Sequence, residues 1–342
     1  MKPRMRTRRV VATLMTVGVG LTALAACGSD DDGGSAAGDC GGSSAVGTPQ
    51  TGTDSGDSVE KGLARVAPAS QTEAREKKEP GGTITLGIIP SWTDGTSMAY
   101  LWKNVLEGKG YKVEIKEVSE AAPLYTGVAQ GDVDIYPSAW PEVTHKSYMD
   151  QYGDDLEDLG TYYDGAKLTF AVPEYVDIDS IEDLTGCADR FDGRIVGIEP
   201  GAGLTEVTKT SVIPEYGLDD YDLVTSSTTA MLSELGTAIE NEEDIVVTLW
   251  RPFWANSEFP VKDLEDPKGA LGEAEGLHAV ATKGFSEENP EVAAMMSKAK
   301  LDDDQYGSLE DLVVNEYGEG KEAEAIDAWM KEHPDFMDSL KG

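Results

Sequence analysis

Three apolar runs in this chain each end at a tryptophan and a proline. They are residues 86–94 (LGIIPSWTD), 131–145 (GDVDIYPSAWPEVTH) and 245–254 (IVVTLWRPFW). Apolar runs rich in β-branched residues and interrupted by proline are typical of short buried strands. The sequence therefore predicts three strands that deliver Trp92, Trp140 and Trp250 to strand ends, where binding residues concentrate in α/β proteins.

A single tryptophan in such a position is more often core or rim packing than a ligand contact. Three tryptophans at matching positions favour a shared site. Several indole faces around one cavity form an electron-rich box, and the ligand that suits it is a quaternary ammonium group, which cannot hydrogen-bond. We therefore expect the three indoles to bind a compound of that kind.

The N-terminus has the pattern of an export signal. Lys2 and four arginines precede an apolar stretch, residues 10–26, that is too short to span a bilayer comfortably. The stretch runs into Cys27 as Leu-Ala-Ala-Cys, which resembles the bacterial lipobox, in which the cysteine carries lipid. The alternative is a plain secretory signal with an incidental cysteine. We expect residues 1–27 to be a lipoprotein signal, and the protein to be exported and lipid-anchored to the outer face of the cell membrane.

Composition changes after the signal. Residues 28–81 are dominated by Gly, Ser, Asp, Thr and Ala, and such a segment cannot bury enough apolar surface to fold, so a flexible tether is expected.

The formal net charge of −36 argues against a nucleic-acid partner, and we interpret the acidity as a solvated surface. The sequence leaves open whether Cys40, in the tether, pairs with Cys187, in the domain.

Strand and helix patterns alternate from residue 82 onward. Strands are predicted at 83–89, 113–118, 167–172, 194–198, 221–225 and 245–249, and helices at 96–108, 122–130, from 181, at 204–213 and at 228–240. This order predicts an α/β fold with mostly parallel sheets flanked by helices. Two similar halves indicate a two-lobed clamshell with the ligand in the inter-lobe cleft. The expected division is lobe 1 at 82–171, lobe 2 at 172–278, and a return to lobe 1 at 279–342.

A glycine-rich turn, residues 199–204 (EPGAGL), follows one of these strands. It lacks the ending of a phosphate loop and the glycine spacing of a dinucleotide fold. Glycines just before a helix leave backbone N–H groups free for an anion, although an ordinary strand-to-helix turn has the same pattern. A zwitterion would place its ammonium in the tryptophan box and its carboxylate on the Gly203 and Leu204 amides. His145 is a candidate for a further hydrogen bond to the carboxylate. The alternative, which is more common for a lone histidine, is a surface or loop residue.

Four motifs in combination resemble a known family. They are residues 91–94 (SWTD), 138–145 (SAWPEVTH), 197–203 (GIEPGAG) and 249–254 (LWRPFW). From residue 82 to the C-terminus the chain resembles the glycine betaine/proline betaine/choline substrate-binding proteins of ABC importers, the OpuAC-like family. The resemblance implies a periplasmic-binding-protein clamshell that closes on its ligand and docks on a membrane permease driven by a cytoplasmic ATPase.

The resemblance also implies roles for individual residues. In betaine-binding members three tryptophans form a prism around the trimethylammonium group, and a histidine and two backbone amides hold the carboxylate. By motif match these residues are Trp92, Trp140, Trp250, His145, Gly203 and Leu204.

Two positions bear on the choice of ligand. Phe253 stands where many relatives have histidine. Asp94 follows Trp92 as in choline-binding members, where the aspartate takes the choline hydroxyl; a residue that satisfies free amides at a helix start is the alternative role. We favour betaines, among glycine betaine, proline betaine, carnitine and choline. A choline-binding protein of the same transporter class and a chemosensory lipoprotein are the alternatives.

Catalysis is not expected. The three histidines are His145, His278 and His333, and none lies beside a Gly-x-Ser-x-Gly elbow or in a metal-binding histidine pair. We therefore predict a binding protein that is not an enzyme, uses no cofactor or metal and acts as a monomer.

Overall fold

The computed structural model describes residues 82–340 of the 342-residue chain. These residues lie in one compact unit. The predicted lipoprotein signal (1–27) and tether (28–81) fall outside the described residues. Within the described part, no helix combines the length and apolar character needed to cross a membrane.

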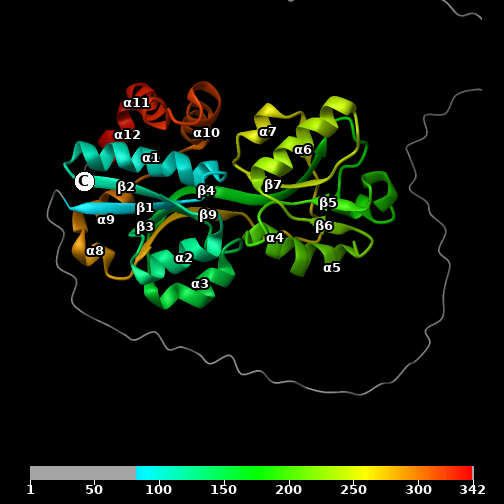
Figure 1. The fold of residues 1–342 in the computed structure, drawn as a ribbon, viewed down its shortest axis with the longest axis horizontal. Helices are drawn as coiled ribbons and strands as arrows, with labels where there is room; N and C mark the ends of the chain where they lie inside the picture. Colours follow the sequence, from blue (N-terminus) through cyan, green and yellow to red (C-terminus); the bar gives the residue numbers. More distant parts are fainter. Residues whose placement is uncertain (1–81, 341–342) are drawn as a thin grey trace, which may run out of the picture. The chain divides into compact units, whose positions relative to one another are not determined.

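The strands form one hydrogen-bonded path in the order β2-β1-β3-β9-β4-β7-β5-β6, with β8 paired to β4 (Figure 1). Their bounds are β1 Thr83–Ile88, β2 Lys112–Glu117, β3 Ile135–Ala139, β4 Leu156–Pro173, β5 Arg194–Val196, β6 Asp222–Val224, β7 Val247–Arg251, β8 Val261–Asp263 and β9 Glu275–Thr282. Parallel pairs join β1 to β2 and β3, and β5 to β6 and β7. The predicted α/β architecture is therefore confirmed, with a parallel group of strands at each end of the path.

Strand β4 connects the two lobes. Its residues Leu156 to Ala166 pair with β9, and Lys167 to Ala171 pair with β7. Lobe 1 therefore contains β1, β2, β3 and β9, and lobe 2 contains β5 to β8. Strands β4, β8 and β9 run antiparallel to their neighbours.

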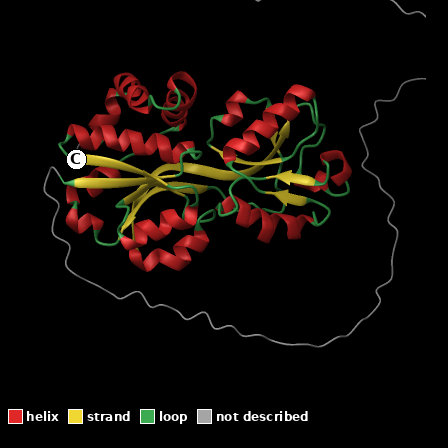
Figure 2. Ribbon diagram, viewed as in Figure 1, coloured by secondary structure: helices red, strands yellow, loops and turns green. Residues whose placement is uncertain are grey.

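Helices cover both faces of the strands in each lobe (Figure 2). In lobe 1, α1 with α10 and α11 lies on one side and α2 with α3 on the other; in lobe 2, α6 and α7 lie opposite α4 and α5 (Figure 1). The helices are α1 Thr93–Gly108, α2 Ala121–Gln130, α3 Lys146–Tyr152, α4 Gly203–Val207, α5 Ile213–Tyr216, α6 Thr228–Asn241, α7 Ala255–Glu258, α8 Phe285–Glu288, α9 Pro290–Met296, α10 Asp303–Asp311, α11 Glu322–Glu332 and α12 Pro334–Ser339.

Local pattern predicted several of these elements closely. The helix expected at 228–240 is α6, whose first turn is capped by the Ser227 hydroxyl. The helix expected at 204–213 is instead α4, a π-helical turn at Thr208–Val212 and then α5. The helix expected from 96 begins three residues earlier, so Trp92 is the N-cap residue of α1. That shift places Trp92 at the junction of β1 and α1.

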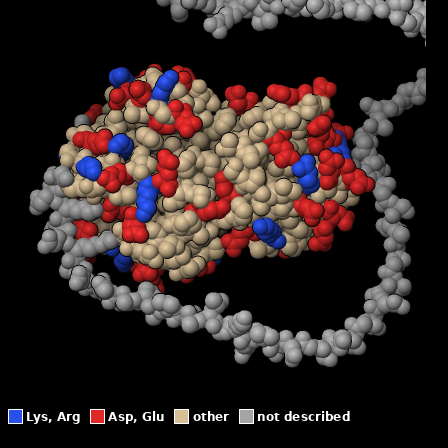
Figure 3. Space-filling view, in the orientation of Figure 1, with Lys and Arg blue, Asp and Glu red and all other residues tan. Residues whose placement is uncertain are grey.

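The surface is strongly acidic, as the composition predicts. Figure 3 shows Asp and Glu spread over both lobes on the face drawn, with Lys and Arg fewer and scattered. Cys187 is buried and disulfide-bonded. The other two cysteines, Cys27 and Cys40, lie outside the described residues.

Candidate functional site

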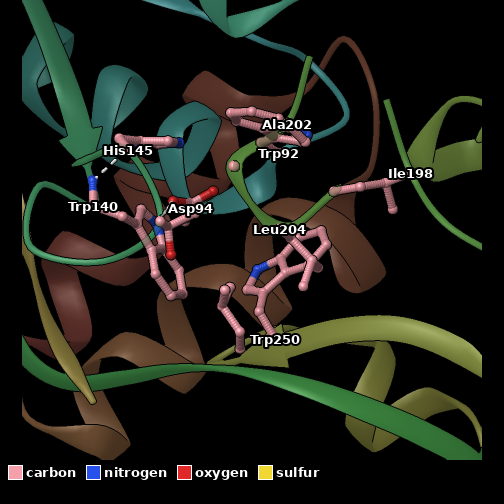
Figure 4. Close-up of a pocket in the computed structure, with 11 residues that line it drawn as sticks. Trp92, Asp94, Trp140, His145, Ile198, Ala202, Leu204 and Trp250 are labelled. Atoms are coloured by element: carbon pink, nitrogen blue, oxygen red, sulfur yellow. Dashed lines mark hydrogen bonds between the residues drawn. The ribbon is translucent and has the colours of Figure 1, made fainter. Parts of the chain in front are cut away.

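One pocket is lined by residues from both lobes (Figure 4). All seven residues predicted to bind ligand line it: Trp92, Asp94, Trp140, His145, Gly203, Leu204 and Trp250. Four further lining residues were not predicted: Thr144, Leu168, Ile198 and Ala202. Residues separated by more than one hundred positions in the sequence therefore meet around one cavity.

The ends of the strands position the three tryptophans. Trp92 follows β1 and Trp140 directly follows β3. Trp250 lies inside β7, paired with Leu168 of β4, and not in the loop after the strand. The ring of Phe253 stacks on Trp250 with 4.0 Å between ring centroids, so the aromatic residue at this divergent position supports the wall of the pocket.

The indole N–H groups of two of these tryptophans donate to buried carboxylates. Trp140 Nε1 donates to Asp94 Oδ2 over 3.1 Å, and Trp92 Nε1 donates to Glu199 Oε2 over 3.1 Å. The three indoles are only 5–7 % exposed. Hydrogen bonds through the ring edge fix the orientation of each of these two rings. The adjacent negative charge also makes the π faces more attractive to a cation.

Asp94 lies in the first turn of α1 and supports the tryptophan box. Its Oδ2 accepts hydrogen bonds from Ser138 Oγ and Trp140 Nε1, and the carboxylate also bonds the Gly95 amide. Burial raises the pKa of Asp94, although these hydrogen bonds oppose the rise. The bond to Gly95 matches the predicted role at a helix start, and the bond to Trp140, 46 positions away, was not predicted.

His145 presents a hydrogen-bond donor toward the pocket. Its Nδ1 accepts the backbone N–H of Trp140 over 3.0 Å and lies 3.0 Å from Tyr125 Oη. The hydrogen of the neutral ring therefore sits on Nε2. The ring extends from Trp140 toward Trp92 and Ala202 (Figure 4), and it stacks on Trp92 at an interplanar angle of 15°.

Burial lowers the pKa of His145 to about 3. We expect its ring resonances to keep their chemical shifts between pH 8 and pH 5 in NMR spectra. His278 is the internal control, since Asp158 and Glu142 outweigh the effect of burial and raise its pKa, so its ring should titrate. The unfolded chain binds a proton at residue 145 below about pH 6.5, so this residue favours unfolding as the pH falls through that value toward 3. A His145 ring that titrates near pH 6.5 would contradict the neutral-donor assignment.

The loop that carries these groups is held by a carboxylate that is distant in sequence but lies on the neighbouring strand β9. Glu275, in β9, accepts the backbone N–H groups of Glu142, Val143 and Thr144 over 3.0–3.1 Å, and also the Thr144 hydroxyl. Four hydrogen bonds to one buried carboxylate therefore hold residues 142–144 in place. Glu275 is thus a positioning residue for Trp140 and His145, a role that no local sequence pattern indicates.

The glycine turn approaches this loop closely. A Cβ atom at Gly203 would lie 1.7 Å from the carbonyl oxygen of Thr144, so only glycine fits there. Gly203 and Leu204 are the first two residues of α4, where backbone N–H groups have no intrahelical partner. In the described part of the chain neither N–H has an acceptor. The pocket therefore combines aromatic faces with backbone donors.

Comparison with known proteins places this architecture in a family. Residues 82–332 match the model for the substrate-binding domain of ABC-type glycine betaine transport systems. The glycine betaine/carnitine transport binding protein GbuC of Listeria monocytogenes is 36 % identical over 162 residues, which cover 46 % of this chain and 51 % of that protein. This chain thus matches about half the length of that relative.

Two solved structures are also similar. The glycine betaine/L-proline-binding protein ProX of Borrelia burgdorferi has a TM-score of 0.70 at 31 % identity, over 75 % of this chain and 96 % of that one. The lactococcal OpuAC in its closed-liganded conformation complexed with glycine betaine has a TM-score of 0.70 at 31 % identity, over 76 % of this chain and 100 % of that one. This chain belongs to the family of substrate-binding domains of ABC-type glycine betaine transport systems.

Proposed function

We propose that this protein is the extracytoplasmic substrate-binding component of an ABC importer, and that it captures glycine betaine or a related betaine. The observation that carries the proposal is the composition of the pocket. Three buried indoles, two backbone N–H groups without a protein acceptor and a neutral histidine donor line the same cavity. A zwitterion with a methylated ammonium and a carboxylate complements both kinds of surface.

The trimethylammonium group would lie among Trp92, Trp140 and Trp250. A methylated ammonium has no N–H to donate, so its recognition depends on aromatic faces. Each desolvated cation–π contact contributes up to about 2 kcal/mol. The charge of Asp94, next to Trp140, adds attraction for the cation.

The carboxylate would accept hydrogen bonds from the Gly203 and Leu204 amides and from His145 Nε2. Hydrogen bonds to a charged group contribute roughly 1.5–3 kcal/mol each. Together with the cation–π contacts they exceed the ~8 kcal/mol that a micromolar dissociation constant requires, before the entropic cost of binding.

Choline binding is the second candidate, because Asp94 lines the pocket and a carboxylate suits a hydroxyl donor. Two observations favour the betaine. Asp94 already accepts hydrogen bonds from Ser138, Trp140 and Gly95, and the amides of Gly203 and Leu204 suit an anionic acceptor with two oxygens, which choline lacks.

The membrane partners would be those of an ABC importer. We propose that Cys27 carries the lipid that anchors the protein on the outer face of the membrane, and that the protein acts as a monomer. The two lobes would close on the ligand and present it to a permease coupled to a cytoplasmic ATPase.

Calorimetric titration of the purified full-length protein with glycine betaine tests this proposal. We expect saturable one-to-one binding with a dissociation constant in the micromolar range or tighter. Glycine is the matched control, because it shares the carboxylate and lacks the three methyl groups, and it should not bind measurably. Equal binding of glycine, or no binding of glycine betaine, would contradict the assignment.

A further inference from the structure

Glu199, the first residue of the glycine-rich turn, accepts hydrogen bonds from both lobes. Within lobe 2 its carboxylate accepts the backbone N–H of Thr228 over 3.0 Å and the Thr228 hydroxyl over 2.8 Å. From lobe 1 it accepts Ser91 Oγ over 3.0 Å and Trp92 Nε1 over 3.1 Å. The side chain is 5 % exposed, so these four donors replace water around a buried charge.

No Lys, Arg or His of the described residues lies within ion-pair distance of this carboxylate. The four hydrogen-bond donors to this carboxylate are therefore all uncharged groups, and two of the four come from the opposite lobe. When the lobes separate, Ser91 and Trp92 move away from Glu199, and water must take their place. The buried carboxylate thus contributes to closure only when both lobe 1 donors are in position.

The indole that Glu199 holds also belongs to the ligand pocket, whereas Glu199 itself does not line it. Trp92 stacks on His145 with 5.9 Å between ring centroids. A bond from lobe 2 to the Trp92 ring edge therefore fixes the orientation of one wall of the pocket and supports the histidine behind it.

We propose that Glu199 is a closure latch, a positioning residue that couples the assembly of the tryptophan box to the closure of the two lobes. The inference rests on the proposed function, since it assigns the latch to the same pocket. In the closed protein the latch holds Trp92 in its binding orientation, and in the open protein the ring is released. Glu199 therefore governs the rate at which bound ligand leaves more than the rate at which it enters.

A bond between the lobes that is made by α4 provides a control. The Ser147 hydroxyl, in α3, donates to Glu206 Oε2 in α4 over 2.8 Å, and this bond is exposed. It joins the lobes without contacting a pocket residue. Glu206, like Glu199, is a carboxylate that bonds lobe 1 from lobe 2, but it does not contact Trp92. The Glu206→Gln variant is therefore the matched control for Glu199→Gln.

The test is stopped-flow tryptophan fluorescence with glycine betaine on the full-length protein. We expect Glu199→Gln to raise the dissociation rate about tenfold or more and to change the association rate less than about threefold. Glu206→Gln should change both rates less than about twofold, as for exposed surface pairs. Ser91→Ala removes one lobe 1 donor and leaves the carboxylate in place, so it should raise the dissociation rate by a smaller factor. This variant tests the latch even if the Glu199→Gln protein folds poorly.

A double-mutant cycle with Trp92→Phe distinguishes a latch from a general structural role. Phenylalanine keeps an aromatic face but has no N–H, so Glu199→Gln should have a clearly smaller effect on the dissociation rate in that background. Additive effects of the two substitutions, or an unchanged dissociation rate in Glu199→Gln and Ser91→Ala, would overturn the latch. Those results presuppose that the unmodified protein binds glycine betaine, so they are distinct from a failure of the proposed function.

Discussion

Gly203→Ala is expected to abolish glycine betaine binding, with a loss of affinity above about a hundredfold. The alanine Cβ would lie 1.7 Å from the Thr144 carbonyl oxygen and 2.6 Å from its carbonyl carbon. Both contacts are with backbone, which Glu275 holds through four hydrogen bonds, so the loop cannot move aside. Gly203 and Thr144 belong to different lobes, so the clash is relieved only when the lobes separate.

The same geometry predicts that the Gly203→Ala protein still folds. Each lobe keeps its own strands and core, so the far-ultraviolet circular dichroism of the ligand-free variant should match that of the unmodified protein. Calorimetric titration measures the loss of binding. Gly307→Ala, in α10, is the matched control, because its Cβ meets no atom within 4 Å and the affinity should not change. Unchanged affinity in Gly203→Ala would contradict the close approach of the two lobes.

Trp140→Ala should weaken glycine betaine binding at least tenfold. The substitution removes one of three aromatic faces, for which a desolvated contact contributes up to about 2 kcal/mol. It also removes the indole N–H donor to Asp94 and leaves a cavity beside a buried carboxylate. The combined loss of binding free energy is therefore larger than that from removing a single surface contact.

Two further variants separate these causes. Trp140→Phe keeps an aromatic face and loses the bond to Asp94, so its affinity should lie between those of the unmodified protein and Trp140→Ala. Trp254→Ala removes a half-buried tryptophan of the same neighbourhood that does not line the pocket, and the affinity should stay within about threefold. Near-unchanged affinity in Trp140→Ala would remove the three-indole model.

The parts of the site that were predictable from sequence are those with a local signal. Trp92, Trp140 and Trp250 each stand next to a proline at a strand end, and the glycine turn precedes a helix. These features depend on residues within a few positions of one another. The two-lobed α/β fold followed from the alternation of strands and helices, because that alternation is also local.

The parts that were missed depend on long-range contacts. Glu275 meets the loop of Thr144 from 131 positions away, and Glu199 meets Trp92 from 107 positions away. An acidic residue in so acidic a chain carries no sign of a buried structural role. The antiparallel pairing of β9 was missed for the same reason, since its partners β3 and β4 are chosen by the fold of the whole domain.

We expect one pocket to recognise both ends of a zwitterion. The most direct test is parallel calorimetric titration with glycine betaine and with choline. Both carry a trimethylammonium group, but glycine betaine has a carboxylate where choline has a hydroxyl. We expect at least tenfold tighter binding of glycine betaine, because only its carboxylate satisfies the Gly203 and Leu204 amides and His145. Tighter binding of choline would contradict the zwitterion site and assign the polar contact to Asp94.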